Sequence, residues 1–171
     1  MRSFSLSLLL LSAWTVSAQD AGTASRFAGT WKIDLEACSD PAPMLEHYEA
    51  NIFIRKFARS IAPTNIITWK TNRFDLEVQA PFFHRTTTVF LDGKTSTADD
   101  ILGNPYEYTS VIAGEAIISK GLIKRKDGTN ERFELTRTLE PNGTMVTRMT
   151  IFVKDGRPLE VKRVFKRQPA D

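Results

Sequence analysis

Apolar and polar residues alternate in one run after another from Asn65 onward. The stretch 73–80 alternates without an interruption, and this period of two predicts strands that bury one face. The strands predicted near 115–126, 132–140, 144–154 and 158–167 indicate an antiparallel meander. Pairs typical of tight hairpin turns interrupt the pattern: Asp92-Gly93, Asp127-Gly128, Asn142-Gly143 and Asp155-Gly156.

One further strand and one helical stretch precede this meander. Trp31, Ile33 and Leu35 alternate with charged residues within 27–36, as expected for a half-buried strand. Prolines at 41 and 43 suit the first turn of a helix, and the helical pattern of 44–61 ends before Pro63. It divides near 49–51 into two short segments. We therefore predict an all-β fold: a single up-and-down antiparallel β-barrel of about ten strands, with a short helix pair after the first strand.

The first 18 residues have the features of a secretory signal peptide. Arg2 supplies the charged start, and Val16-Ser17-Ala18 fits a cleavage site. The apolar stretch 4–16 between them is shorter than the roughly 20 residues of a membrane-spanning helix. Residues 19–26 are small and polar, which predicts a flexible lead-in, and 27–168 would form one domain. We expect a secreted or periplasmic monomer.

Composition argues against several classes of protein. The sequence carries a net charge of +3, so loss of Arg2 leaves +2, too little to indicate a nucleic-acid-binding protein. Cys38 is the only cysteine, which rules out an internal disulfide. Two histidines are too few for a metal site rich in histidine or cysteine, and we expect no cofactor.

Two of the predicted strands place an arginine, Arg137 or Arg163, on an otherwise apolar face. An unpaired guanidinium inside a protein costs several kcal/mol, so two that face one interior predict a cavity for an anion. In the alternative, such a side chain packs over Trp31 in a structural cation–π contact. Arg148 has the opposite parity and is expected in solvent. The residues that share the two faces are Phe133, Leu135 and Leu139, and Leu159, Val161 and Phe165.

The order of the elements and several short motifs resemble the fatty-acid-binding protein family, a branch of the calycin (lipocalin-related) group. The resemblance covers about 27–167. It implies a carrier of fatty acids or similar small hydrophobic carboxylic acids, held in the barrel interior. The motifs are Phe27-Ala28-Gly29-Thr30-Trp31-Lys32, the helical segment 44–65, Thr97-Ala98-Asp99-Asp100 as a loop before the middle strands, and Arg163-Val164-Phe165.

The resemblance also implies a binding site. By position, Arg137 and Arg163 match two family arginines that hold the lipid carboxylate, directly or through water, and Phe165 matches a tyrosine. Phenylalanine lacks the hydroxyl that completes this head-group site. Export is a second departure, because the family is mostly cytosolic. The other side chains expected to line or close the interior are Phe53, Phe57, Phe74, Leu76, Val78, Phe90, Tyr106, Tyr108, Ile118, Leu122 and Phe133.

The basic residues of the helical stretch allow two interpretations. Arg55, Lys56 and Arg59 would draw it to an anionic membrane, with Phe53 and Phe57 dipping in, or they form a solvated face. Asn142-Gly143-Thr144 also has two interpretations, a glycosylation sequon and a hairpin turn.

Two other functions use the same barrel. An isomerase or cyclase would act on a hydrophobic molecule in the cavity, with His84, Tyr106, Glu107 and Tyr108 as acid–base candidates. A haem-binding barrel would use His84 as its axial ligand.

Overall fold

The computed structural model describes residues 22, 25–81, 83–100, 102–154 and 156–169. The predicted signal peptide, most of the lead-in and Asp155 of the last predicted turn lie outside these residues. Ten strands form one sheet: β1 (Gly29–Ile33), β2 (Thr64–Lys70), β3 (Arg73–Ala80), β4 (Phe83–Phe90), β5 (Ser96–Asp99), β6 (Pro105–Ala113), β7 (Ala116–Lys124), β8 (Asn130–Leu139), β9 (Met145–Phe152) and β10 (Leu159–Arg167).

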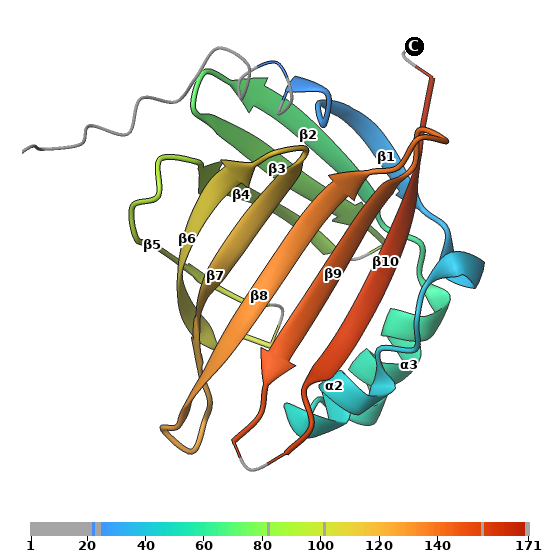
Figure 1. The fold of residues 1–171 in the computed structure, drawn as a ribbon. Helices are drawn as coiled ribbons and strands as arrows, with labels where there is room; N and C mark the ends of the chain where they lie inside the picture. The colour runs from blue at the N-terminus through green and yellow to red at the C-terminus, as the bar shows by residue number, and fades with distance from the viewer. Residues whose placement is uncertain (1–21, 23–24, 82, 101, 155, 170–171) are drawn as a thin grey trace, which may run out of the picture.

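Every pairing in the sheet is antiparallel, and the order is β4-β3-β2-β1-β10-β9-β8-β7-β6-β5. Strands that follow one another in sequence are neighbours, apart from β4 and β5, and β1 pairs with β10, which rolls the sheet into a barrel (Figure 1). This confirms the predicted up-and-down barrel. The two edge strands, β4 and β5, face each other across its remaining open side. Side chains bridge that side: the Tyr108 hydroxyl donates to the Thr88 carbonyl at 3.3 Å.

Three helical segments follow β1: η1 (Leu35–Ala37), α2 (Ala42–His47) and α3 (Ile52–Ser60). The last two lie beside one end of the barrel, next to β10 (Figure 1). The predicted break between two helices is confirmed. Glu49 adopts a positive φ of 54° there, and the Asn51 side chain caps α3 by accepting the Ile54 N–H at 2.9 Å.

Two boundaries differ from the prediction. The first strand ends at Ile33, because the chain turns into η1 directly after Asp34, where the Ala37 N–H donates to the Asp34 carbonyl at 3.2 Å. The segment expected as a loop around Thr97 is strand β5, which pairs with β6. Asp100 ends it by accepting the backbone N–H groups of Leu102 and Asn104.

The end of the barrel away from the helices is filled by side chains. Phe27, Trp31 and Phe74 are completely buried, and the Trp31 indole donates to the Phe27 carbonyl at 2.8 Å. The expected cation–π contact on Trp31 exists, but Arg167 makes it, with its guanidinium carbon 4.2 Å from the ring centroid. Arg137 and Arg163 are therefore not needed for that structural role.

Three residues expected to line the interior lie on the outer face. Ile117 is opposite Arg137 in the register and is 1% exposed, so Ile118 points outward, as does Leu122, which is 46% exposed. The interior face of β7 instead carries Ile117, Ser119, Gly121 and Ile123. Phe90 likewise faces outward and packs under Arg73, because its neighbour Val89 occupies the interior.

Candidate ligand-binding site

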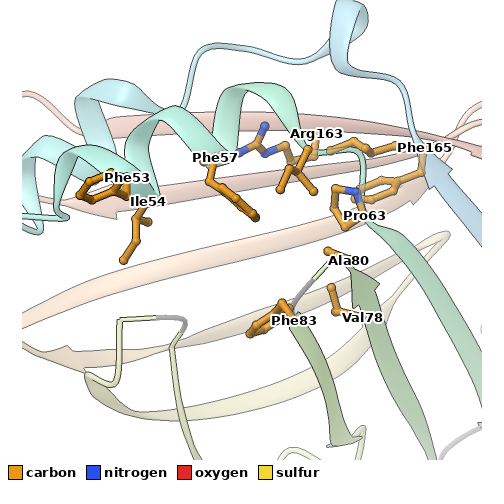
Figure 2. Close-up of a pocket in the computed structure, with 12 residues that line it drawn as sticks. Phe53, Ile54, Phe57, Pro63, Val78, Ala80, Phe83, Arg163 and Phe165 are labelled. Atoms are coloured by element: carbon orange, nitrogen blue, oxygen red, sulfur yellow. The ribbon is translucent and has the colours of Figure 1, made fainter.

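Two cavities lie between the helices and the barrel interior. The first, here called the α3 chamber, has a volume of about 410 Å³, and Figure 2 shows Phe53, Ile54 and Phe57 of α3 on one side of it. Its lining is almost entirely apolar. Among the described residues that form it, Arg163 is the only charged one. The other lining residues are Ala58, Ile61, Ile33, Pro63, Val78, Ala80, Phe83 and Phe165.

The second cavity, here called the α2 chamber, also has a volume of about 410 Å³. Met44, Leu45 and Tyr48 cover it from α2 and its C-cap. Val78, Phe83 and Arg163 line both chambers, so the two adjoin each other at this arginine. Barrel residues that line the α2 chamber include Tyr106, Phe133, Leu135, Thr147, Met149 and Val161.

The two predicted arginines lie at the same level of the barrel. Thr147 of β9 pairs with Arg137 of β8 on one side and with Arg163 of β10 on the other. Residues opposite each other in an antiparallel sheet point to the same face, so the three side chains form one inward row. Neighbouring strands are about 4.8 Å apart, which places the two arginine backbones about 10 Å apart. That spacing is short enough for both guanidinium groups to approach one carboxylate.

Arg137 lies deep in the interior, where no carboxylate of the described residues pairs with it. Arg137 is 8% exposed, and its Nη1 atom is buried without a hydrogen-bond partner among the described residues. Its guanidinium carbon lies 5.6 Å from the Phe74 ring centroid. Burial lowers the pKa of Arg137 to about 10, partly opposed by Tyr106 and Tyr108, so it remains a cation at neutral pH. A buried cation in this state is a ready site for an anion.

Phe165 is buried at the level below the arginine row, opposite Ile33 and Met145. Figure 2 shows its ring on the lining of the α3 chamber, together with Arg163. The position that would offer a tyrosine hydroxyl in the resembled family is therefore apolar. The inward row one level above it consists of Arg137, Arg163 and Thr147.

The predicted lining residues that face inward separate into two groups. Phe53, Phe57, Phe165, Tyr106 and Phe133 line one of the chambers. Phe74, Leu76 and Tyr108 do not line either chamber and belong to the packed interior or its edge. Arg137 also lies just beyond the chamber lining, as the next inward residue of β8 after Phe133 and Leu135.

The sequence prediction did not include Arg85, which lines the α2 chamber from β4. Its Nη1 donates to the Asp100 carbonyl at 3.1 Å, across the open side between β4 and the end of β5. The sequence did indicate an inward Arg85, because this residue lies an even number of positions from Phe83 and Val89 and therefore points to the same face of the strand. The intervening polar residues at 84 and 86–88 hid that pattern.

Polar side-chain contacts tie the two helices to the barrel and to each other. The His47 Nε2 lies 2.8 Å from a Glu131 carboxylate oxygen, and this carboxylate is 5% exposed. Arg125 reinforces the contact by donating to the His47 carbonyl at 2.9 Å. Between the helices, Arg55 pairs with Glu46 at 3.2 Å.

α3 presents both apolar and basic side chains outward. Ile52 is 68% and Phe53 78% exposed. Arg55 is engaged by Glu46, and Arg59 makes a two-bond contact with Asp40 at 2.8 and 3.0 Å. Lys56 has no ion pair within the part of the chain that the structure describes. The outer face is thus more apolar and less cationic than the sequence alone indicated.

Two of the acid–base candidates point away from the cavity. The His84 side chain is 66% exposed and contacts Glu77 at 2.8 Å on the outer surface, which rules it out as an axial haem ligand inside the barrel. Glu107 is exposed, opposite the outward Leu122. Within the described residues, no group of three His, Cys, Asp or Glu could hold a metal ion. No described helix is long and apolar enough to span a membrane.

Comparisons with known proteins agree with this geometry at the level of the fold. No protein-family model matches the chain, and neither does any curated protein sequence. Solved structures do match. The REP1-NXSQ fatty acid transporter is 19% identical, with a TM-score of 0.69, and the match covers 86% of this chain and 99% of that one.

Two further solved structures show the same relationship. Lipid binding protein 8 of Caenorhabditis elegans is 17% identical with a TM-score of 0.68, over 84% of this chain and 96% of that one. The fatty-acid-binding protein 1 of Echinococcus granulosus is 14% identical with a TM-score of 0.65, and the match covers 84% of this chain and 98% of that one. Through ten antiparallel strands and a helix pair after the first of them, this chain has the fold of the fatty-acid-binding proteins.

Proposed function

We propose that this protein carries a long-chain fatty acid, or a similar hydrophobic carboxylic acid, inside the barrel. The observation that carries the proposal is the inward row of Arg137, Thr147 and Arg163. Arg163 lines both chambers, Thr147 lines the α2 chamber, and Arg137 lies just beyond the lining. Arg137 is buried, its Nη1 has no hydrogen-bond partner among the described residues, and a ligand carboxylate would supply one. The similarity in fold to a fatty acid transporter supports the same ligand class.

The two parts of the site would contribute differently to binding. Each buried methylene contributes about 0.8 kcal/mol, so a long acyl chain gains roughly 10 kcal/mol before the cost of association. A charge-assisted hydrogen bond adds roughly 1.5–3 kcal/mol. The chambers therefore provide most of the affinity, and the arginines select a carboxylate over an uncharged head group.

The experiment compares hexadecanoate with its methyl ester. Arg163→Leu or Arg137→Leu should weaken acid binding by about 10- to 150-fold and leave ester binding unchanged. Arg148→Leu is the matched control, because Arg148 is exposed on the outer face. Equal losses for acid and ester would exclude a head-group role. Mass spectrometry of lipids extracted from the purified protein would identify the natural ligand.

The proposal has three finer parts. Export through the predicted signal peptide would place the carrier outside the cell or in the periplasm. Action as a monomer is consistent with a ligand enclosed by one chain.

Transient membrane contact would use the exposed Ile52 and Phe53, with Lys56 beside them. Because Arg55 and Arg59 are paired with Glu46 and Asp40, this contact would depend more on apolar insertion than on anionic lipid.

A further inference from the structure

Arg85 is an inward-facing cation that the head-group row does not use. It pairs with Val78 in the register, and Val78 lines both chambers, so Arg85 shares the interior face. Its one hydrogen bond within the described residues goes to the Asp100 carbonyl. It has no ion pair with a described carboxylate. The rest of its guanidinium is thus available to a molecule in the α2 chamber.

Tyr106 supplies a second polar group to the same chamber. Its ring is fixed by packing against Tyr108 and Phe133, at centroid distances of 5.3 and 5.7 Å. Its hydroxyl makes no hydrogen bond within the described part of the chain. Burial raises the pKa of Tyr106, and the positive charge of Arg85 opposes that rise, which is consistent with the two groups being close.

The charges of the chamber wall restrict what these groups can bind. Asp99 and Asp100 also line the α2 chamber. The Asp100 carboxylate accepts hydrogen bonds from the Leu102 and Asn104 backbone and from the Asn104 amide, which fixes it in the wall. A second carboxylate on the ligand would meet these two acids. An uncharged hydroxyl would not, and it both accepts a hydrogen bond from Arg85 and donates one to the Tyr106 oxygen.

We propose that Arg85 and Tyr106 form a second polar subsite that binds a hydroxyl group on the acyl chain, so that the protein prefers hydroxylated fatty acids. Arg163 reaches the same chamber from β10, so one ligand can have its carboxylate at Arg163 and its hydroxyl at Arg85. The inference rests on the proposed function, because it assumes that a fatty acid occupies the chambers. It adds a ligand class that the head-group row alone does not select.

The test uses pairs of ligands that differ by one hydroxyl: 12-hydroxyoctadecanoate against octadecanoate, and 16-hydroxyhexadecanoate against hexadecanoate. Titration calorimetry gives the ratio of their dissociation constants for each protein variant. The unmodified protein should bind at least one hydroxylated acid more tightly than its parent. Arg85→Leu should reduce that preference by about tenfold, and Tyr106→Phe by a few-fold, while Arg148→Leu leaves it unchanged.

A purely structural role for Arg85 predicts a different result. The contact with Asp100 ties the two edges of the sheet together, so its loss could lower stability and weaken every ligand equally. Equal losses for both members of each pair would overturn the proposal. Tyr106→Phe keeps the packed ring and removes only the hydroxyl. The preference for hydroxylated acids can therefore be measured in this variant even if Arg85→Leu does not fold. Arg85→Lys, which keeps the charge, should retain part of the preference.

The remaining outcomes separate this inference from the proposed function. If no parent acid binds the unmodified protein, the proposed function fails. If parent acids bind and Arg163→Leu weakens them, but the hydroxyl preference is absent or indifferent to Arg85 and Tyr106, only the second subsite fails. If Arg85→Leu loses binding of the parent acids and Arg163→Leu retains it, the carboxylate lies at Arg85 and the inference is overturned.

Discussion

Replacing Arg137 by methionine should make the free protein more stable. Burial lowers the pKa of Arg137 from its ordinary value to about 10, and this difference corresponds to about 3 kcal/mol of unfavourable free energy for the charged form. The cation–π contact with Phe74 offsets roughly 0.5–1 kcal/mol. Methionine keeps the unbranched apolar part of the side chain and carries no charge. We therefore expect the free energy of unfolding to rise by about 2 kcal/mol.

The dependence on pH gives this prediction a sharper form. Because the pKa is lower in the folded state, the unfolded chain holds the extra proton in a window that begins near pH 10 and ends at the ordinary pKa of arginine. The contribution of Arg137 to the free energy of unfolding of the unmodified protein therefore rises with pH in that window. The advantage of Arg137→Met should be full at pH 7 and smaller by about 1 kcal/mol at pH 11. The positive charge of Arg137 lowers the pKa of Tyr106 and of Tyr108, so the difference between the two proteins reports Arg137 together with these two tyrosines.

Equilibrium urea unfolding at pH 7 and pH 11 measures these values, and binding of hexadecanoate and its methyl ester is measured on the same samples. The expected variant is more stable and binds the acid less tightly, with the ester unaffected. A variant that is less stable by 1 kcal/mol or more would refute the reasoning, and so would a gain in stability that is the same at pH 7 and pH 11. Arg137 would then be a structural residue with an unseen partner.

Four further results are expected. Arg167→Leu should destabilise the protein by about 1–2 kcal/mol without affecting acid or ester binding, because it removes the Trp31 contact and a 2.6 Å bond to the Ala28 carbonyl; a melting curve and one titration check this. Gly121→Ala should cost about 1–3 kcal/mol in urea unfolding, because its Cβ would lie 2.8 Å from the Tyr108 Cα; unchanged stability would contradict the close approach of β6 and β7. Phe165→Tyr should tighten acid binding about fivefold relative to the ester, by calorimetry, if its hydroxyl reaches the carboxylate. N-terminal sequencing of exported protein should begin after residue 18, and a product that retains Met1 would disprove cleavage.

Much of the site was predictable wherever one strand face is clearly apolar. Arg137 and Arg163 were assigned inward from the parity of their own strands, and the register through Thr147 bears this out. Local pattern failed on β7, where Ile117 and Ile118 are both apolar and either could face inward. Leu122 and Ile123 pose the same ambiguity. Only the pairing with β8 decides which member of each pair is inside.

The sequence alone determined the repeating strands, the helical break before α3 and the inward parity of the two arginines, because each depends on spacing within a short segment. The tertiary structure decided which arginine covers Trp31, how far the interior is open, and that Arg85 faces a chamber. These depend on groups far apart in sequence: Arg167 lies against the first strand, and α2 and α3 cover the cavities. A local pattern indicates which face is apolar, and only the packed barrel decides what that face meets.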